Sequence, residues 1–178
     1  MIFKYRVLFS WLLVFIWMGS IFYLSGMSSD SSNSKSKESI SVVVESSIHV
    51  TNDLGITNEP ISKSNINSIV NVLNKPLRKC MHSFMYFVLV ILLLNAFKSM
   101  CIFNITSVYL YSVAVSIFYA FTDEFHQLFV SGRTGQLMDV GIDMIGVLFG
   151  VLVFYYIYDK IPLLLLITII VKLFEIMY

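Results

Sequence analysis

Long apolar runs, separated by short polar segments, dominate the pattern along this chain. A helix needs about 20 mostly apolar residues to cross the hydrocarbon core of a bilayer, and several runs approach that length. The pattern therefore predicts an all-α fold, a polytopic transmembrane helical bundle of about five spans. Spans joined by short connections should be antiparallel neighbours. The predicted spans are residues 7–24, 81–97, 102–121, 137–158 and 162–177.

The longest polar segment separates the first two apolar runs. Its first part, residues 28–41, is rich in serine and asparagine, which is typical of a flexible segment. Residues 40–50 and 61–73 place apolar side chains at weakly helical spacing, so each is either a surface helix or a solvated linker. The predicted domains are a first transmembrane helix at 1–25, a long polar extracytoplasmic loop at 26–79 and a four-helix membrane core at 80–178.

Charges beside the first apolar run bear on its orientation. Lys4 and Arg6 precede the run and favour a cytoplasmic N-terminus. No convincing small-x-small cleavage site follows, so we interpret the run as an uncleaved helix and not as a signal peptide. A count over all connections favours the reverse orientation, because a cytoplasmic N-terminus leaves Lys35, Lys63 and Lys75, among others, outside.

Composition supports the membrane interpretation. Apolar residues make up 57% of the chain and charged residues 13%, whereas soluble domains average about 45–50% and 25%. A net charge of +1 without a basic stripe excludes nucleic acid as a partner. Cys80 and Cys101 flank one predicted span, too far apart for a disulfide, so we predict two free thiols. No metal-ligand spacing occurs, and we predict neither a metal nor a cofactor.

Ionisable and polar residues gather at one end of the predicted bundle. Because spans alternate in direction, the entry to the second span, the exit of the third and the entry to the fourth lie on the same side of the membrane. Ionisable residues in spans are costly and are functional candidates by default. The candidate ligand-binding residues are Arg78, Lys79, His82, Tyr86, Asp123, Glu124, His126, Gln127, Arg133, Asp139 and Asp143.

Helical spacing places several of these side chains on shared faces. Asp123 and Gln127 are one turn apart. Asp143 shares a face of the fourth span with Gly146 and Gly150, a pair of small residues that lets a neighbouring helix approach closely. Asp143 should therefore face that helix and not lipid.

Each candidate alone also has an ordinary explanation. Arg78, His82 and Tyr86 lie on one helical stripe, but Tyr86 by itself suits an anchor in the aromatic belt. His82 and His126 suit interfacial histidines, and Asp139 suits a stabilising acid at a helix N-terminus. We favour a functional site because so many polar residues share one face of the bundle.

The order of these residues resembles the VanZ-like family. The matching elements are Arg78-Lys79, His82 and Tyr86, then Asp123-Glu124 with His126-Gln127, then Gly132-Arg133 and Asp139 before a glycine-rich helix, with Trp11 and Trp17 in the first span. The likeness covers nearly the whole chain, and Asp143 stands where family members often carry asparagine. The resemblance implies a multi-pass protein of the bacterial plasma membrane, and the family's founding member is linked to low-level teicoplanin resistance.

Two functions compete. The first is binding of a cell-envelope ligand, such as a membrane lipid, a lipid-linked cell-wall precursor or a lipoglycopeptide, with Arg78, Lys79 and Arg133 on its phosphate or carboxylate. The second is an enzyme that modifies a headgroup, with His82 and Glu124 as catalytic residues in acid–base or metal-assisted chemistry. No serine nucleophile-elbow motif is present. A transporter, for which no inverted repeat is visible, and a purely structural bundle rank lower.

Overall fold

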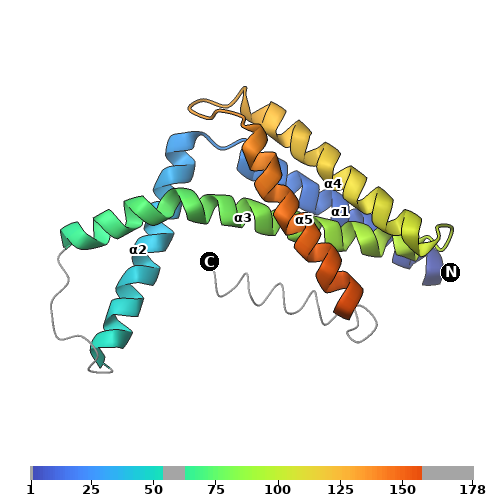
Figure 1. The fold of residues 1–178 in the computed structure, drawn as a ribbon, viewed down its shortest axis with the longest axis horizontal. Coiled ribbons are helices and arrows are strands. Elements are labelled where there is room, and N and C mark those ends of the chain that lie inside the picture. Colours follow the sequence, from blue (N-terminus) through green and yellow to red (C-terminus); the bar gives the residue numbers. More distant parts are fainter. Residues whose placement is uncertain (1, 54–62, 158–178) are drawn as a thin grey trace.

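Five helices make up the part of the chain that the structure, a computed structural model, describes, namely residues 2–53 and 63–157. The helices are α1 (Ile2–Ser25), α2 (Ser29–Asp53), α3 (Lys63–Ser99), α4 (Ile105–Gln127) and α5 (Leu137–Ile157) (Figure 1). The predicted all-α bundle is confirmed. The predicted fifth span at residues 162–177 lies outside the described residues.

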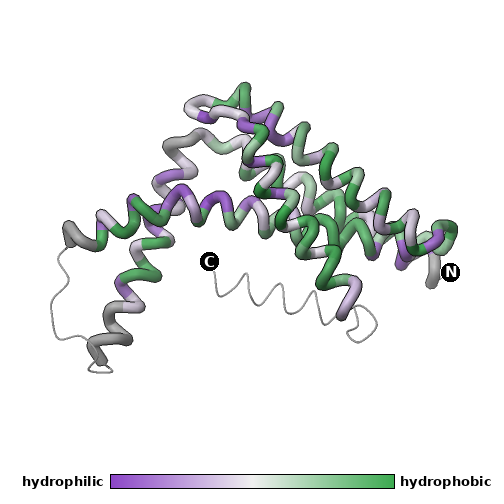
Figure 2. The backbone as a smooth tube through the Cα atoms, viewed as in Figure 1, coloured by the Kyte–Doolittle hydropathy of each residue, from purple (hydrophilic) through white to green (hydrophobic). Residues whose placement is uncertain are grey.

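Four of these helices, α1, α3, α4 and α5, are long and apolar enough to cross a membrane. Figure 2 shows hydrophobic residues along all four. The central helix is α3, because 61% of the residues in its most apolar stretch are buried, whereas only 17% to 33% are buried in the corresponding stretches of the other three helices. Large apolar side chains such as Leu12, Phe118 and Leu148 remain exposed. The bundle therefore packs around α3 and presents apolar side chains outward, as contact with lipid requires.

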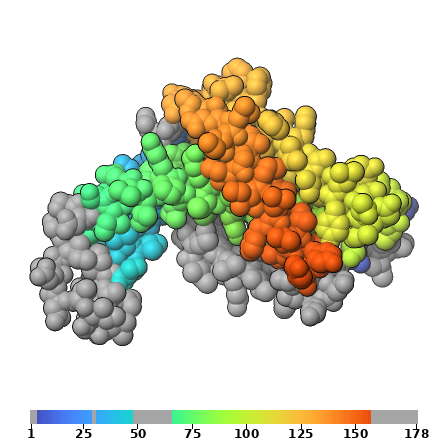
Figure 3. Space-filling view, viewed as in Figure 1, coloured from blue at the N-terminus to red at the C-terminus, as the bar shows by residue number. Residues whose placement is uncertain are grey.

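Helices α3 and α5 pack closely because α5 carries glycine at the contact. A Cβ atom at Gly146 would lie 1.9 Å from the carbonyl oxygen of Ser83, and one at Gly150 would lie 2.4 Å from Cγ1 of Val90. The hydroxyl of Ser83 donates to the carbonyl of Ile142 at 2.9 Å. Figure 3 shows α5 lying across α3 on the face in view. The predicted role of the glycine pair is confirmed, and Asp143 is buried on the same helix.

Helix α1 is held to α3 and α4 by polar side chains within an apolar contact. The indole of Trp17 donates to the carbonyl of Met85 at 2.9 Å, and the phenol of Tyr119 donates to the carbonyl of Met18 at 2.6 Å. Deep between α1 and α3, Asn95 donates to the hydroxyl of Ser10 at 3.1 Å. Interhelical hydrogen bonds of this kind fix the register of helices whose apolar contacts alone are weakly directional.

The predicted flexible segment at residues 28–41 is helical, and this part of the prediction was wrong. Most of it belongs to α2, where serine hydroxyls donate back to carbonyls one turn earlier, as Ser36 does to Ser32. Contacts with α3 then hold the helix in place, because Ser36 and Asn33 bond the side chain of Asn74. Tertiary contact therefore stabilises a helix that its serine-rich composition disfavours.

The second predicted span begins much earlier than its apolar run. Residues 61–73 and 81–97 were predicted as separate elements, yet most of both lie in α3, which continues through Pro76. A proline inside a helix removes one backbone hydrogen bond. Asn74 and Arg78, which flank the proline, both bond Asn33 of α2 and so support the helix on each side. The predicted domain boundary between residues 79 and 80 falls within this helix, and Figure 1 shows its first half and α2 projecting from the bundle.

Helix α4 also extends past its apolar run, and this extension carries the polar residues that follow the run. Asn104 caps its start by accepting a hydrogen bond from the amide of Ser107 at 2.8 Å. Asp123, Glu124 and Gln127 then occupy its last turns, not the connection to α5. The two cysteines, Cys80 and Cys101, are both exposed free thiols, as predicted.

Candidate functional site

A polar cluster lies where the end of α1, the middle of α3, the end of α4 and the start of α5 meet. The predicted convergence of residues far apart in the chain is therefore observed. Several of the cluster's members are almost completely buried, among them Ser25 at 0% exposed, Asp123 at 2% and Asp143 at 1%. Buried polar groups of this kind require partners, because an unpaired charge in an apolar interior is costly.

His82 of α3 lies at the centre of the cluster. Its Nε2 atom is 3.2 Å from the hydroxyl of Ser25 and 4.0 Å from Oδ2 of Asp123. Its Nδ1 atom is 3.6 Å from Oδ1 of Asp143. The Ser25 hydroxyl also lies 2.8 Å from Oδ2 of Asp123, to which it donates. One imidazole thus approaches two buried carboxylates and one hydroxyl, each from a different helix.

Gln127 joins the two acids at the end of α4. Its Nε2 atom donates to Oδ2 of Asp123 at 3.2 Å and to Oε1 of Glu124 at 3.1 Å. The other oxygen of Glu124 accepts the backbone amide of Gln136 at 2.9 Å. A Cβ atom at Gly135 would lie 2.5 Å from the carbonyl oxygen of Glu124, so a residue without a side chain is needed there. Neutral donors, a side-chain amide and a backbone amide, therefore hold these two acids at the end of α4.

The three cations lie around the cluster and have different partners. Lys79 pairs with Asp139 at 2.5 Å, and this pair is partly exposed. Arg78 donates to the side-chain oxygen of Asn33 at 2.6 Å. Arg133, in the connection between α4 and α5, donates to the side-chain oxygen of Gln127 at 3.3 Å and to a backbone carbonyl of α1 at 3.4 Å.

Burial lowers the pKa of the Arg133 guanidinium, and the nearby charge of Arg78 lowers this pKa further. The carboxylates of Asp123 and Glu124 oppose both effects. An arginine remains protonated in proteins despite such a shift. Arg133 is therefore a permanent, half-buried positive charge close to a second one.

Several polar atoms of the cluster have no hydrogen-bond partner within the described part of the chain. These atoms are the Tyr86 hydroxyl, Oδ1 of Asp123, Nδ1 of His126, Nε of Arg133 and Oδ2 of Asp143. The ring of Tyr86 lies 6.2 Å from that of His82. His126 instead stacks on Phe22, with ring centroids 4.0 Å apart, and so faces α1 and not the acids. Unpartnered buried groups concentrated in one place are typical of a binding or catalytic site.

Reasoning from the sequence missed three contributors to this cluster. Ser25 ends α1 and reaches the central histidine, Asn33 bonds a cation from α2, and Gln136 supplies a backbone amide to an acid. The serine-rich exit of the first span was the only available signal for Ser25. The proposed acid–base pair of His82 and Glu124 is not hydrogen-bonded among the described residues, because Glu124 bonds Gln127 and Gln136.

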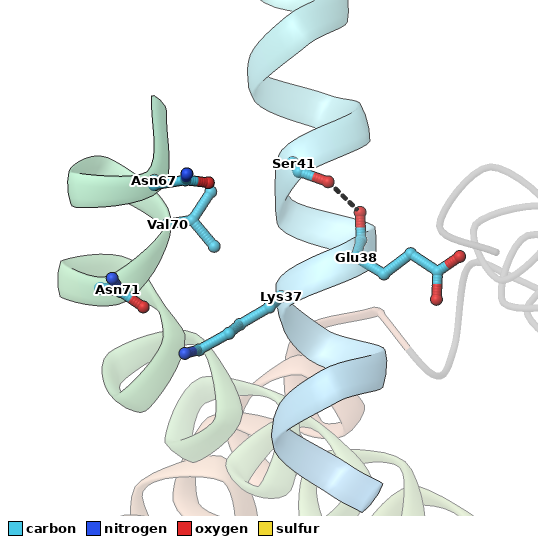
Figure 4. Close-up of a pocket in the computed structure, with 6 residues that line it drawn as sticks. All are labelled: Lys37, Glu38, Ser41, Asn67, Val70 and Asn71. Atoms are coloured by element: carbon cyan, nitrogen blue, oxygen red, sulfur yellow. Dashed lines mark hydrogen bonds between the residues drawn. The ribbon is translucent and has the colours of Figure 1, made fainter. Parts of the chain in front are cut away.

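A groove of about 410 Å³ lies apart from this cluster, between α2 and the first half of α3 (Figure 4). Its lining residues are Lys37, Glu38, Ser41, Asn67, Val70 and Asn71. Figure 4 shows the carboxylate of Glu38 pointing away from α3. Within the described residues, no group of three or more His, Cys, Asp and Glu side chains is arranged to hold a metal ion. The buried cluster is therefore the stronger candidate site.

The fold and the cluster define an all-α membrane protein with a buried histidine–carboxylate centre at one end of its helical bundle. A family model, VanZ/LLP1, matches residues 9–159. The chain therefore belongs to the VanZ/LLP1 family, which confirms the family resemblance of its sequence. The match includes every residue of the cluster. Comparison with curated proteins and with solved structures gives no match.

Proposed function

We propose that this protein is a multi-pass protein of the bacterial plasma membrane that binds an anionic amphiphile of the cell envelope. The ligand class comprises lipid headgroups, lipid-linked glycans and lipoglycopeptides that carry phosphate or carboxylate. The binding groups are Arg78 and Arg133, assisted by Lys79, at an outward-facing end of the bundle. Through this binding the protein contributes to teicoplanin-type resistance.

The observation that carries this proposal is the pair of neighbouring guanidinium groups. Within the described part of the chain neither has a carboxylate partner, since Arg78 bonds Asn33, and Arg133 bonds Gln127 and the carbonyl of Leu24. Their mutual effect is repulsive, because the charge of Arg78 adds to burial in lowering the pKa of Arg133. An anion between them relieves that repulsion and accepts the planar donor groups that guanidinium offers to phosphate and carboxylate.

Asp123, Glu124 and Asp139 support this assignment because each has a bonding partner other than the two arginines. Asp123 accepts from Ser25, Glu124 accepts from Gln127 and a backbone amide, and Asp139 pairs with Lys79. Neither arginine needs to release a carboxylate before it binds a ligand. The two guanidinium groups therefore provide the anion site, and the acids hold the helices that carry it.

The first test measures anion binding directly. The full chain in phosphatidylcholine nanodiscs is titrated calorimetrically with dihexanoyl-phosphatidylglycerol, with inorganic phosphate as a second probe. Hydrogen bonds to charged groups contribute about 1.5–3 kcal/mol, so Arg78→Gln and Arg133→Gln should each weaken binding of the lipid at least about tenfold. A response to phosphate alone would assign the site to free anions, and so contradict an amphiphile ligand.

Lys75→Gln is the matched control for this test. It removes the same charge one turn from Arg78, and Lys75 is exposed. Binding should change less than about twofold, because exposed charges are screened by salt. Equal losses in all three variants would mean that general surface charge, and not the arginine pair, attracts the lipid.

The second test measures resistance in a bacterial host. Cells that express the wild type should tolerate more teicoplanin than empty-vector cells, with little change for vancomycin, which lacks the acyl chain of an amphiphile. Arg133→Ala, His82→Ala and Glu124→Gln should lose this protection at matched membrane levels, whereas Lys75→Gln should keep it. If the wild type gives no protection, the resistance role is wrong, and lipid binding must be judged from calorimetry alone.

A further inference from the structure

Ser25, His82 and Asp143 lie in a row at the centre of the cluster, each on a different helix. The Ser25 hydroxyl is 3.2 Å from Nε2 of His82, and Nδ1 of the same ring is 3.6 Å from Oδ1 of Asp143. The hydroxyl therefore lies at Nε2 of the imidazole, and the carboxylate lies at Nδ1 on the other side of the ring. This is the arrangement by which a serine nucleophile is activated on unrelated folds.

We propose that Ser25 is a nucleophile that accepts the acyl group of a carboxylic ester in an anionic amphiphile, with His82 as its base and Asp143 as the positioning residue. This activity rests on the proposed function in one respect, namely that the site binds the anionic headgroup. The serine adds bond cleavage at the same site, which makes the protein an esterase.

A second carboxylate competes for the proton of Ser25 in this arrangement. The hydroxyl donates to Oδ2 of Asp123 at 2.8 Å, and His82 is the longer contact. Rotation about the Cβ–Oγ bond redirects the hydrogen from Asp123 to His82 and leaves both oxygens and the imidazole in place. The separation of 3.6 Å at Asp143 exceeds a hydrogen bond, and such contacts are often looser before substrate binds.

Arg133 contacts the backbone of the residue next to the proposed nucleophile. Its Nη2 atom bonds the carbonyl of Leu24, the residue before Ser25 in the chain. Its Nε–H is buried and has no partner within the described residues. A preorganised donor beside the nucleophile stabilises the oxyanion of a tetrahedral intermediate. We assign this role to the Nε–H of Arg133.

The reaction balances with water as its only co-reactant. The Ser25 oxygen attacks the ester carbonyl while its proton moves to Nε2 of His82, which forms a C–O bond and an oxyanion. Collapse breaks the bond to the leaving alcohol, which takes the proton from His82. Water, deprotonated by the same imidazole, then attacks the acyl-serine, and the carboxylic acid leaves as Ser25 regains its proton.

Spacing along α3 indicates which ester is reached. Arg78 and His82 are four residues apart, so they are separated by about 6 Å along the helix axis. In a glycerophospholipid, only a few bonds lie between the phosphate and the nearest acyl ester, which is a similarly short distance. A phosphate held by the arginine pair therefore brings that ester to Ser25. The side chain of His82 is 28% exposed, so the ester approaches the buried serine past the imidazole.

The experiment is covalent labelling of the full chain in detergent with a small alkyl fluorophosphonate, followed by peptide mass mapping. One adduct on Ser25 is expected. His82→Gln and Asp143→Asn should slow labelling at least about tenfold, because both remove the activation of the hydroxyl. Ser20→Ala is the matched control on the same helix, since the Ser20 hydroxyl donates to the carbonyl of Ile16 in its own helix, and it should label like the wild type.

Two further measurements separate the possible failures. Wild-type protein should release butanoate from dibutyryl-phosphatidylglycerol, and Ser25→Ala should abolish this while still binding dihexanoyl-phosphatidylglycerol. Absence of an adduct on wild-type Ser25, with a known serine esterase labelled in parallel, overturns the nucleophile and leaves the binding proposal standing. If the wild type does not bind dihexanoyl-phosphatidylglycerol, the proposed function is overturned whether or not Ser25 is labelled.

Discussion

Replacing Gly146 by alanine is expected to lower the free energy of unfolding of the bundle by about 3 kcal/mol, at the upper end of ordinary overpacking effects. The added Cβ would lie 1.9 Å from the carbonyl oxygen of Ser83 and 2.7 Å from its carbonyl carbon. Backbone atoms cannot turn aside as a flexible side chain does, so α5 must move away from α3. That movement also separates the helices that carry His82 and Asp143.

The control for this prediction lies one and a half turns earlier on the same helix. A Cβ at Gly141 meets nothing within 4 Å, and alanine is favoured over glycine in helices by about 1 kcal/mol. Gly141→Ala should therefore stabilise the protein slightly, whereas Gly146→Ala destabilises it. Unfolding in detergent, followed by circular dichroism against added denaturant, measures both. Equal effects of the two substitutions would show that α3 and α5 are not in close contact.

The spans and the gathering of the polar residues could be predicted from the sequence. Apolar runs report directly on burial in lipid, and alternating crossings place Lys79, Asp123 and Asp139 at one end whatever the details of packing. Likewise, Gly146 and Gly150 at a spacing of four residues predict close approach without a structure. These features depend on properties averaged over a whole helix or on a simple period.

The partners within the cluster could not be predicted in this way. Arg133 lies at the same end of the bundle as the acids of α4, but it bonds Gln127 and a carbonyl of α1 and neither acid. Which donor bonds which acceptor depends on the rotation and tilt of the helices, and the hydropathy pattern does not determine either. Ser25 was missed for the same reason, because a serine at the end of an apolar run looks like any polar exit.

The helical state of α2 could not be predicted because its stability comes from another element. Its serines favour turns and caps over helix interiors. The contacts that offset this preference, from Asn33 and Ser36 to Asn74 and Arg78, join residues about 40 positions apart. The continuity of α3 through Pro76 has a similar cause, because Asn74 and Arg78 on either side of the proline are held by Asn33 of α2.

Removal of the central imidazole is expected to have a comparably large effect. His82→Ala should lower the free energy of unfolding by about 3–5 kcal/mol, because it opens a cavity in the packed bundle and removes a polar neighbour of two buried acids. Asp123 and Asp143 are 2% and 1% exposed and lie 4.0 and 3.6 Å from the ring. Without the imidazole, the two buried carboxylates lose a polar neighbour and face each other across the space that the ring vacates.

Asp143→Asn separates this electrostatic cause from the simple loss of a packed ring. If the damage in His82→Ala comes from uncompensated charge, adding Asp143→Asn should restore about half of the lost stability, because only Asp123 then remains charged. If the damage comes from the cavity, the two substitutions should add, since neutralising an acid does not fill space. Unfolding titrations of the two single variants and the double variant decide between these causes. A strictly additive result would assign His82 a packing role and remove the electrostatic reason for placing it between two acids.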